Sequence, residues 1–290
     1  MAQALARLLV ERGQPLAAIA GRSVERAARA AEFAGGGVAA VALAELPARA
    51  ERVIVAVSDQ AIPEVAAILA GAGMRAGVAL HTSGAYGPEA LEPLEAAGVS
   101  CGVWHPLQTV SSPEAGCANL PGVSFAVSGD GDAAAWALEL TALLGGTALQ
   151  IRPENMPLYH AAAVMASNYV VTLIDAAAIL MQAAGVGEQE ALQALERLTT
   201  ASAAAAFARG PARALTGPIE RGDVATIERH TAALPAVPLE VRNLYRAAGL
   251  HTAAIARRAA LPEAVAAALK EILDRNEQRN HADRQTRARA

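Results

Sequence analysis

Polar side chains that could bind a phosphorylated cofactor follow the first short apolar run of the chain. The segment AIAGRS ends that run with Gly21, Arg22 and Ser23, where a helical pattern begins. In a dinucleotide-binding fold the second strand ends beside the adenosine ribose, where an arginine accepts a 2′-phosphate. Arg22 therefore favours NADP over NAD. The alternative is that Ser23 only caps the helix and Arg22 is a surface charge.

Two further polar residues follow the apolar run VIVAV. Ser58 comes first, and it could line the path of the cofactor's phosphate and ribose at the carboxyl edge of a parallel sheet. Asp59 follows and is expected to cap the helix that begins near Ile62 and Pro63. This pair predicts one cofactor contact and one helix start.

Histidines end the next two apolar runs, in the segments LHTSGAYG and GVWHPLQTV. We expect them at one sheet edge, with His105 as a catalytic group and with His81 and Gln108 as substrate contacts. Ser83 and Gly84 are expected to contact the cofactor, because a glycine lets backbone approach a nicotinamide closely. Either histidine could instead bond a neighbouring loop, but two together favour a functional site.

A second polar group lies in the segment YHAAAVMASNY, which predicts one long apolar helix from Tyr159 to about residue 184. At about 100° per residue, Ser167 falls within roughly 20° of His160, and Asn168 within roughly 80°. Burying such groups costs free energy unless they are paired. We expect His160 and Asn168 to be catalytic and Ser167 to bind substrate. Hydrogen bonding between helices is the alternative.

The segment ALTGPIERGDVATIERH combines a Gly-Pro turn with charged residues. Thr216 and Arg221 could anchor an anionic substrate, and Asp223 is expected to cap the next helix. A purely structural turn is equally compatible with this pattern.

Short apolar runs alternate with helical patterns up to about residue 152, which predicts a mainly parallel sheet covered by helices. The expected strands are Leu16–Ala20, Val53–Val57, Val78–His81, Ser100–Trp104, Val123–Val127 and Ala148–Ile151. Helical patterns alone follow, which predicts an all-α second domain. The expected domains are 1–152 and 153–276, followed by a disordered tail at 277–290.

Composition excludes several classes of function. The net charge of −4 gives no basic surplus for binding nucleic acid. Cys101 and Cys117 have neither C-x-x-C spacing nor histidines at ligand spacing, so a metal site is not expected. We see no uninterrupted strongly apolar run of about 18 residues and no secretion signal, which predicts a cytoplasmic protein without a membrane partner.

These motifs together resemble a bacterial family that pairs a Rossmann-like domain with a helical domain of uncharacterised function. The segments that carry the resemblance are GRS, HTSG, HPLQT, YHAAAVMASN and LTGPIERGD, and the likeness extends to about residue 275. More distantly, the chain resembles the 6-phosphogluconate dehydrogenase superfamily, including ketopantoate reductase and pyrroline-5-carboxylate reductase. The resemblance implies an NADP-binding first domain, a helical second domain that forms a homodimer, and a substrate cleft between them.

The ketopantoate reductase pattern has a lysine followed by asparagines four and eight residues later. If His160 takes the lysine position, Asn168 matches the last asparagine, while Val164 replaces the middle one. His160 or His105 would then donate a proton as hydride reduces a small oxo or imino acid. A non-catalytic sensor or scaffold that binds a nucleotide or metabolite is the alternative.

Relatives in this superfamily begin with a strand and a glycine-rich turn, and the first residues of this chain resemble the part after those glycines. Such a strand is central in the usual order, and its turn supplies amides that hold pyrophosphate. We therefore expect the chain as given to bind NADP weakly or not at all.

Overall fold

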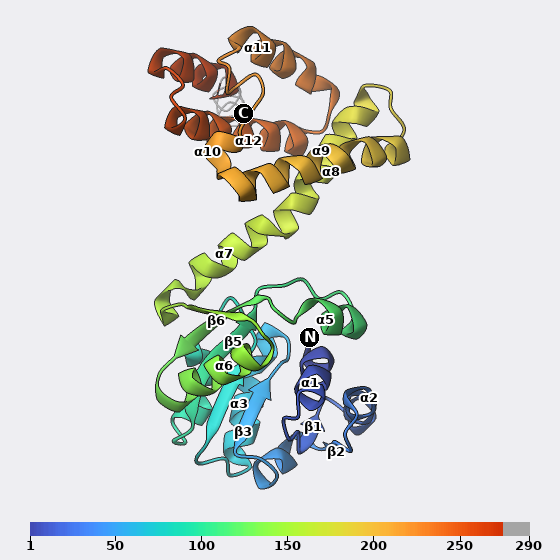
Figure 1. The fold of residues 1–290 in the computed structure, drawn as a ribbon, viewed down its shortest axis with the longest axis vertical. Helices are drawn as coiled ribbons and strands as arrows, with labels where there is room; N and C mark the ends of the chain where they lie inside the picture. Colours follow the sequence, from blue (N-terminus) through green and yellow to red (C-terminus); the bar gives the residue numbers. More distant parts are fainter. Residues whose placement is uncertain (275–290) are drawn as a thin grey trace, which may run out of the picture. The chain divides into compact units, whose positions relative to one another are not determined.

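The computed structural model describes residues 1–274, which form two compact units (Figure 1). The first unit is Met1–Ser167, and the second begins at Asn168. The division lies later in the chain than the predicted boundary at 152, because the helix after the last strand groups with the first unit. The predicted tail at 277–290 lies outside the described residues.

The first unit contains two sheets. Five of its strands lie where the sequence predicts them, with shifted ends, and Val78–His81 is matched at both ends. The strands are β1 (Ala18–Ala20), β2 (Ala39–Val41), β3 (Arg52–Val55), β4 (Val78–His81), β5 (Ser100–Pro106), β6 (Ser124–Gly129) and β7 (Thr147–Gln150). The strand order is β1-β2 in one sheet and β3-β4-β5-β6-β7 in the other. β2 was not predicted, because the small residues around it carry a weak strand signal.

The register places the ends of three parallel strands at one edge. Val55 of β3 pairs with His81 of β4, which pairs with Val103 of β5. β5 continues past this level and pairs with the antiparallel strand β6. The segments after β3 and β4 and the last residues of β5 therefore lie at the same edge of the sheet. With β6 and β7 parallel again, the prediction of a mainly parallel α/β domain is confirmed.

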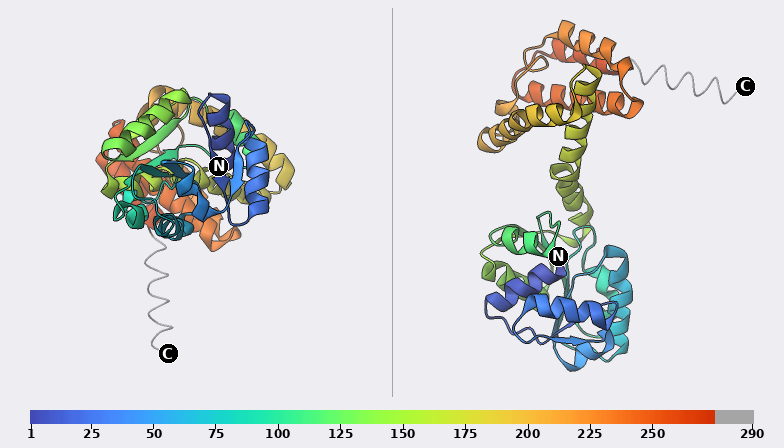
Figure 2. Two further views of the ribbon diagram at one scale, coloured as in Figure 1. Left: turned by 90° about the horizontal axis from the view of Figure 1, so that it is seen from below. Right: turned by 90° about the vertical axis from the view of Figure 1, so that its right-hand side faces the viewer.

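Helices cover this larger sheet because its strands are apolar on both faces. Val78 and Leu80 of β4 pack in one core cluster, and Ala79 packs in another, as the two-residue period of a strand requires. The helices of this unit are α1 (Ala2–Glu11), α2 (Val24–Ala34), α3 (Ile62–Gly71), α4 (Glu92–Glu95), α5 (Pro113–Asn119), α6 (Gly131–Leu143) and α7 (Met156–Ala166). Figure 2 shows α1 and α2, in dark blue, lying side by side.

The sheet is interrupted between β1 and β3, which belong to different sheets. In a doubly wound sheet of order 3-2-1-4-5, the first strand lies between the second and the fourth. The observed β1 and β2 correspond to the second and third strands of that order. The observed β3 and β4 correspond to the fourth and fifth strands, on the other side of the central strand. The expectation of weak NADP binding by the chain as given stays a prediction.

The second unit is helical throughout its described part, as predicted. Its helices are α8 (Asn168–Ala183), α9 (Glu188–Arg209), α10 (Pro211–Ala214), α11 (Val224–Ala233), α12 (Leu239–Arg258) and a further helix at 263–274. One core cluster joins α11, α12 and the helix at 263–274, and a second joins α8 to α12.

The prediction of one long helix from Tyr159 to about 184 is wrong. The helix is interrupted at Ser167, whose φ of −126° and ψ of −77° are not helical. The Ser167 hydroxyl donates a hydrogen bond to the Ala163 carbonyl at 2.7 Å, a backbone contact that often bends helices. The interruption invalidates the angular relation predicted between His160 and Asn168, which lie in different units.

Much of the apolar surface on these helices is exposed. Pro153–Ala183 is long and apolar enough to cross a membrane by length and composition, and its most apolar 18-residue window has a mean hydropathy of 1.7 and is 11% buried. The stretch contains His160, Asn168 and Asp175, so it is not an uninterrupted apolar run, and the absence of a membrane partner stays a prediction. The exposed side chains on α7 to α9 include Leu158, Met165, Tyr169, Val170, Val171, Leu173, Leu192, Leu198 and Phe207.

Candidate functional site

Three ring side chains meet at the carboxyl edge of the larger sheet, within the first unit. His105 lies near the end of β5, beyond the level at which β4 ends. Its Nδ1 lies 2.8 Å from the hydroxyl of Tyr159 on α7. The His160 ring, on the next residue of α7, lies edge-on to His105 with centroids 6.2 Å apart. The structure thus brings together both histidines that the sequence proposed as proton donors.

Gly84 lies directly against the two imidazoles. A Cβ atom at this position would lie 2.8 Å from His160 Nδ1 and 2.9 Å from His105 Nε2. Both contacts are shorter than real Cβ atoms make, so a side chain here would displace the rings. Gly84 is predicted to contact the cofactor. The structure adds a second requirement for glycine, because a side chain at this position would collide with the two imidazole rings.

His81 holds the loop that carries Gly84. The ring is fully buried, with Nε2 lying 2.8 Å from the Gly87 carbonyl and Nδ1 accepting from the Ser83 amide at 3.2 Å. Ser83 is also buried, and its hydroxyl oxygen accepts from the Ala85 amide. His81 was predicted to bind substrate, but both ring nitrogens are committed to backbone groups. It is a positioning residue for this loop.

Burial sets the protonation of the site. Desolvation, and then the proximity of His160, lowers the pKa of His105 to about 4. Desolvation raises the pKa of Tyr159 to about 12. At neutral pH the pair is therefore a neutral imidazole and a phenol. A neutral His105 that accepts the Tyr159 proton at Nδ1 carries its own proton on Nε2.

Two ring nitrogens of the cluster have no hydrogen-bond partner in the described part of the chain. His105 Nε2 has no hydrogen-bond partner among residues 1–274. This nitrogen is not fully enclosed by those residues, so a ligand can reach it. His160 Nδ1 is enclosed and has no partner within the same residues. Buried polar atoms are normally paired, so an unpaired one needs an explanation, and a bound ligand would supply a partner.

Acid should destabilise the first unit between about pH 6.5 and pH 4. Burial lowers the folded-state pKa of both His81 and His105, so the unfolded chain binds more protons in this range and stability falls with pH. Both tryptophans lie in this unit, so their fluorescence reports its melting temperature. We expect His105→Gln to reduce the acid-induced decline in melting temperature by roughly 3 °C. The same substitution at the exposed His251 should leave the decline intact, and an unchanged decline in His105→Gln would contradict the assignment.

The predicted 2′-phosphate contacts lie at the start of α2. Ser23 caps this helix, its hydroxyl oxygen accepting from the Arg26 amide at 3.3 Å. Arg22 is exposed, and no ion pair holds it within the described residues. The Glu25 carboxylate accepts from its own amide and from Ser23, which lowers the pKa of Glu25. A phosphate bound here would compete with Glu25, so Arg22 is the group free to attract it.

The other predicted residues have simpler surroundings. Ser58 is exposed in the segment that follows β3. Gln108 is also exposed, and its side-chain oxygen accepts a hydrogen bond from the adjacent Thr109 amide. The prediction that Asp59 caps the next helix is wrong, because a short 3₁₀ turn begins at Asp59 and α3 starts only at Ile62.

The remaining predicted residues belong to the second unit. Asn168 begins α8, and Arg221 is exposed in the turn before α11. Asp223 caps α11 as predicted, accepting from the Thr226 amide at 3.0 Å and from its hydroxyl at 2.6 Å. The roles of Asn168 and Arg221 stay predictions.

Sequence reasoning missed Tyr159. The available signal was its place beside His160 in a chain whose aromatic content is only 3%. Its partner His105 lies 54 residues earlier, and single-sequence patterns do not reveal such pairing.

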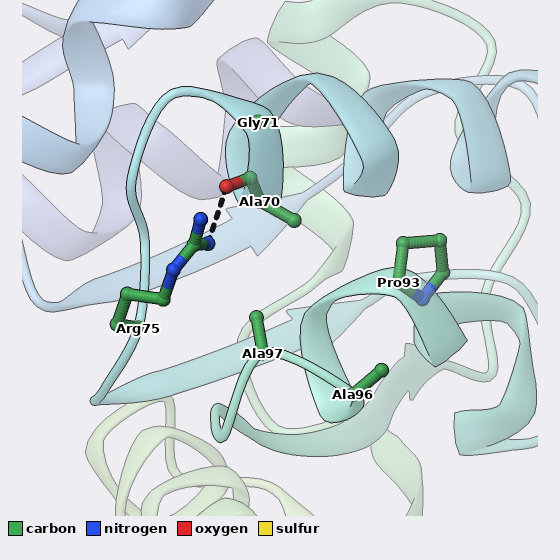
Figure 3. Close-up of a pocket in the computed structure, with 6 residues that line it drawn as sticks. All are labelled: Ala70, Gly71, Arg75, Pro93, Ala96 and Ala97. Carbon is green, nitrogen blue, oxygen red and sulfur yellow. Dashed lines mark hydrogen bonds between the residues drawn. The ribbon is translucent and has the colours of Figure 1, made fainter.

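A shallow hollow of about 460 Å³ lies at the opposite edge of the sheet (Figure 3). Its lining residues precede β4 and β5, which places it at the amino ends of these strands. Arg75 is turned to the Ala70 carbonyl at the end of α3. We assign no ligand to this hollow, which is lined by Ala70, Gly71, Arg75, Pro93, Ala96 and Ala97.

Comparison with known proteins identifies both parts of the chain. Residues 1–106 match the Rossmann-like domain, and residues 123–252 match a domain of unknown function, DUF2520. A comparison with curated protein sequences finds no match.

Solved structures share this fold along most of their length. Protein TM1727 from Thermotoga maritima is 23% identical, with a TM-score of 0.64, 94% of this chain covered and 96% of that one. A Bacteroides fragilis protein, BF3122, assigned as an NADP oxidoreductase, is 23% identical, with a TM-score of 0.65 and coverage of 88% and 94%. An imine reductase from a Pseudomonas species is 19% identical, with a TM-score of 0.57 and coverage of 88% and 92%.

These likenesses establish the fold, and the two domain matches establish the family. The resemblance indicated by the sequence motifs is confirmed. The chain belongs to the proteins that join a Rossmann-like domain to a DUF2520 helical domain.

Proposed function

We propose that the protein is an NADP-dependent oxidoreductase that reduces a small oxo or imino acid. The observation that carries this proposal is the cluster of His105, Tyr159 and His160 against Gly84, at the edge where open α/β sheets bind ligands. Structural relatives assigned as an NADP oxidoreductase and an imine reductase support the reaction class.

The residues present fit one end of the cofactor. Arg22 offers a bidentate fork and α2 a helix N-terminus, which suits a 2′-phosphate. Ser58 and Gly84 would line the cofactor's path along the sheet edge, with Gly21 opening the turn before Arg22. The glycine turn Gly129–Gly131 joins β6 to α6, but β6 runs antiparallel to β5, so this turn lies at the opposite edge of the sheet from His105. Weak binding of NADP by the chain as given stays our expectation. NADPH, when bound, supplies the hydride.

The protein's own part is proton delivery. As hydride reaches the carbon of a C=O or C=N group, the oxygen or nitrogen takes a proton from His105 Nε2. Tyr159 returns a proton to Nδ1, and solvent restores the phenol. A neutral imidazole suits this role because burial prevents the ring from being charged at neutral pH. His160 Nδ1 faces the same glycine and would contact the reacting group.

The direct experiment measures NADPH oxidation with a panel of small oxo acids and cyclic imino acids. We expect a loss of NADPH absorbance with at least one member, at a rate that falls about 100-fold in His105→Ala. His251→Ala, at an exposed position in the second unit, is the control. Equal rates in wild type and His105→Ala would refute the assigned proton donor.

We also propose that a second copy of this chain covers the exposed apolar surface of α8 and α9. Phe207 is 90% exposed and Val171 is 68% exposed. Exposed apolar side chains of this size are typical of a surface that packs against another protein. Asp175 is exposed within the apolar stretch Pro153–Ala183, and a charge at the centre of a bilayer costs about 3 kcal/mol. A partner protein therefore suits this surface better than lipid.

Light scattering tests the dimer. The wild type should have twice the mass of the chain, and Val171→Glu combined with Phe207→Glu should be monomeric, because two buried charges at an interface are unpaired. Leu239→Glu, on α12, changes an apolar side chain that is 48% exposed and should leave the mass unchanged. A monomeric wild type, or binding to lipid vesicles by the wild type alone, would contradict this proposal.

A further inference from the structure

Arg246 lies on the core-facing side of α12. Only 8% of the residue is exposed. The other buried residues that follow it on this helix are Gly249, Ala253 and Ala256. Their spacing of three, four and three residues is that of one buried helical stripe. The sequence thus places an arginine where the pattern calls for an apolar side chain.

The charge of Arg246 has no counterion among residues 1–274. Its Nε is enclosed and makes no hydrogen bond there, whereas its two Nη atoms are not among the enclosed unpaired atoms of these residues. The ion pairs within those residues involve other arginines, namely Arg7, Arg52, Arg152 and Arg257. A buried arginine is rarely found without a partner, because removing its polar atoms from water is unfavourable unless another group pairs with them.

The neighbouring charge makes the position less favourable still. Arg242 lies one turn earlier on α12 and is held in place, its Nε donating to the Val237 carbonyl at 2.6 Å and its Nη2 to the Pro235 carbonyl at 2.8 Å. Burial, and then this second guanidinium, lowers the pKa of Arg246. Two positive groups at one place are stabilised together by an anion between or beside them.

We propose that Arg246, with Arg242 beside it, binds a small oxyanion, either a carboxylate or a phosphate. A guanidinium presents parallel N–H groups that match either group in a bidentate manner. This site belongs to the helical unit and does not depend on the proposed reductase activity.

Calorimetric titration of the full chain with inorganic phosphate, and separately with oxalate, tests the site at constant chloride. We expect saturable binding of one anion per chain that depends on Arg246, and the tighter of the two ligands at this site identifies the class. Arg246→Met should weaken binding at least tenfold, and Arg246→Lys should weaken it less, because the charge remains and the fork is lost. Arg258→Met removes the same charge from an exposed position on α12 and should change nothing.

Thermal melting of the helical signal separates this site from a structural role. Without added anion, Arg246→Met should melt at or above the temperature of the wild type, because it removes a polar atom, Nε, that is buried without a partner. If Arg246 only stabilised the fold, Arg246→Met would instead melt below the temperature of the wild type. The proposal fails if neither anion binds the wild type, if Arg246→Met binds equally well, or if Arg246→Met lowers the melting temperature. NADPH oxidation is measured in parallel, and its result leaves this conclusion unaffected.

Discussion

Gly84→Ala should reduce NADPH-dependent turnover by about 100-fold while the first unit stays folded. The new Cβ would lie 2.8 Å from His160 Nδ1 and 2.9 Å from His105 Nε2, so both rings must move. A shift of about 1 Å in a catalytic group can cost such a factor. The measurement is kcat/KM on the first active substrate, with tryptophan fluorescence reporting that the unit is folded.

Gly87→Ala is the matched control for this substitution. It lies in the same loop, and its Cβ would meet the end of the flexible Glu89 side chain. That side chain can move aside at the cost of the hydrogen bond that it accepts from the Gly87 amide at 2.8 Å. We expect Gly87→Ala to retain most of its activity. Comparable losses in both variants would show that the loop, and not the pair of imidazoles, is what matters.

Tyr159→Phe should lower kcat by about 100-fold with little change in KM. The phenol is bonded to His105 Nδ1, and without it the ring has no internal proton source and no fixed tautomer. The pH profile should change as well, because His105 loses a partner that stabilises its neutral form. Activity is measured across the pH range in which NADPH is stable.

The control for Tyr159→Phe is Tyr86→Phe, at a tyrosine that is 45% exposed in the loop after β4. It should behave as the wild type does. A Tyr159→Phe variant with unchanged kcat and pH profile would mean that solvent supplies the proton directly.

The sequence predicts the fold well because strand and helix periods are local properties. Val78–His81 reads as a strand from four residues, and its position between two helical patterns fixes a parallel sheet. The interruption at Ser167 was not predictable by the same means, since serine is tolerated within helices and its bond to the Ala163 carbonyl is visible only in three dimensions.

The candidate site was predictable only in part. Strand ends are recognisable, so His105 and Gly84 were placed at the right edge. The role of His81 was not, because whether a ring nitrogen faces a substrate or the Gly87 carbonyl depends on loop geometry. Arg246 was overlooked because a buried arginine in a helix has the same sequence pattern as an exposed one.

The cofactor assignment is tested most directly with a fragment that needs no pyrophosphate-binding turn. Adenosine 2′,5′-bisphosphate should bind at least tenfold more tightly than adenosine 5′-monophosphate. Arg22→Ala should abolish that difference and Glu25→Gln should enlarge it, because Glu25 occupies the start of α2. Arg29→Ala, on the exposed side of the same helix, should leave it unchanged. Equal affinity of the wild type for the two nucleotides would contradict an NADP-binding role for this edge of the sheet.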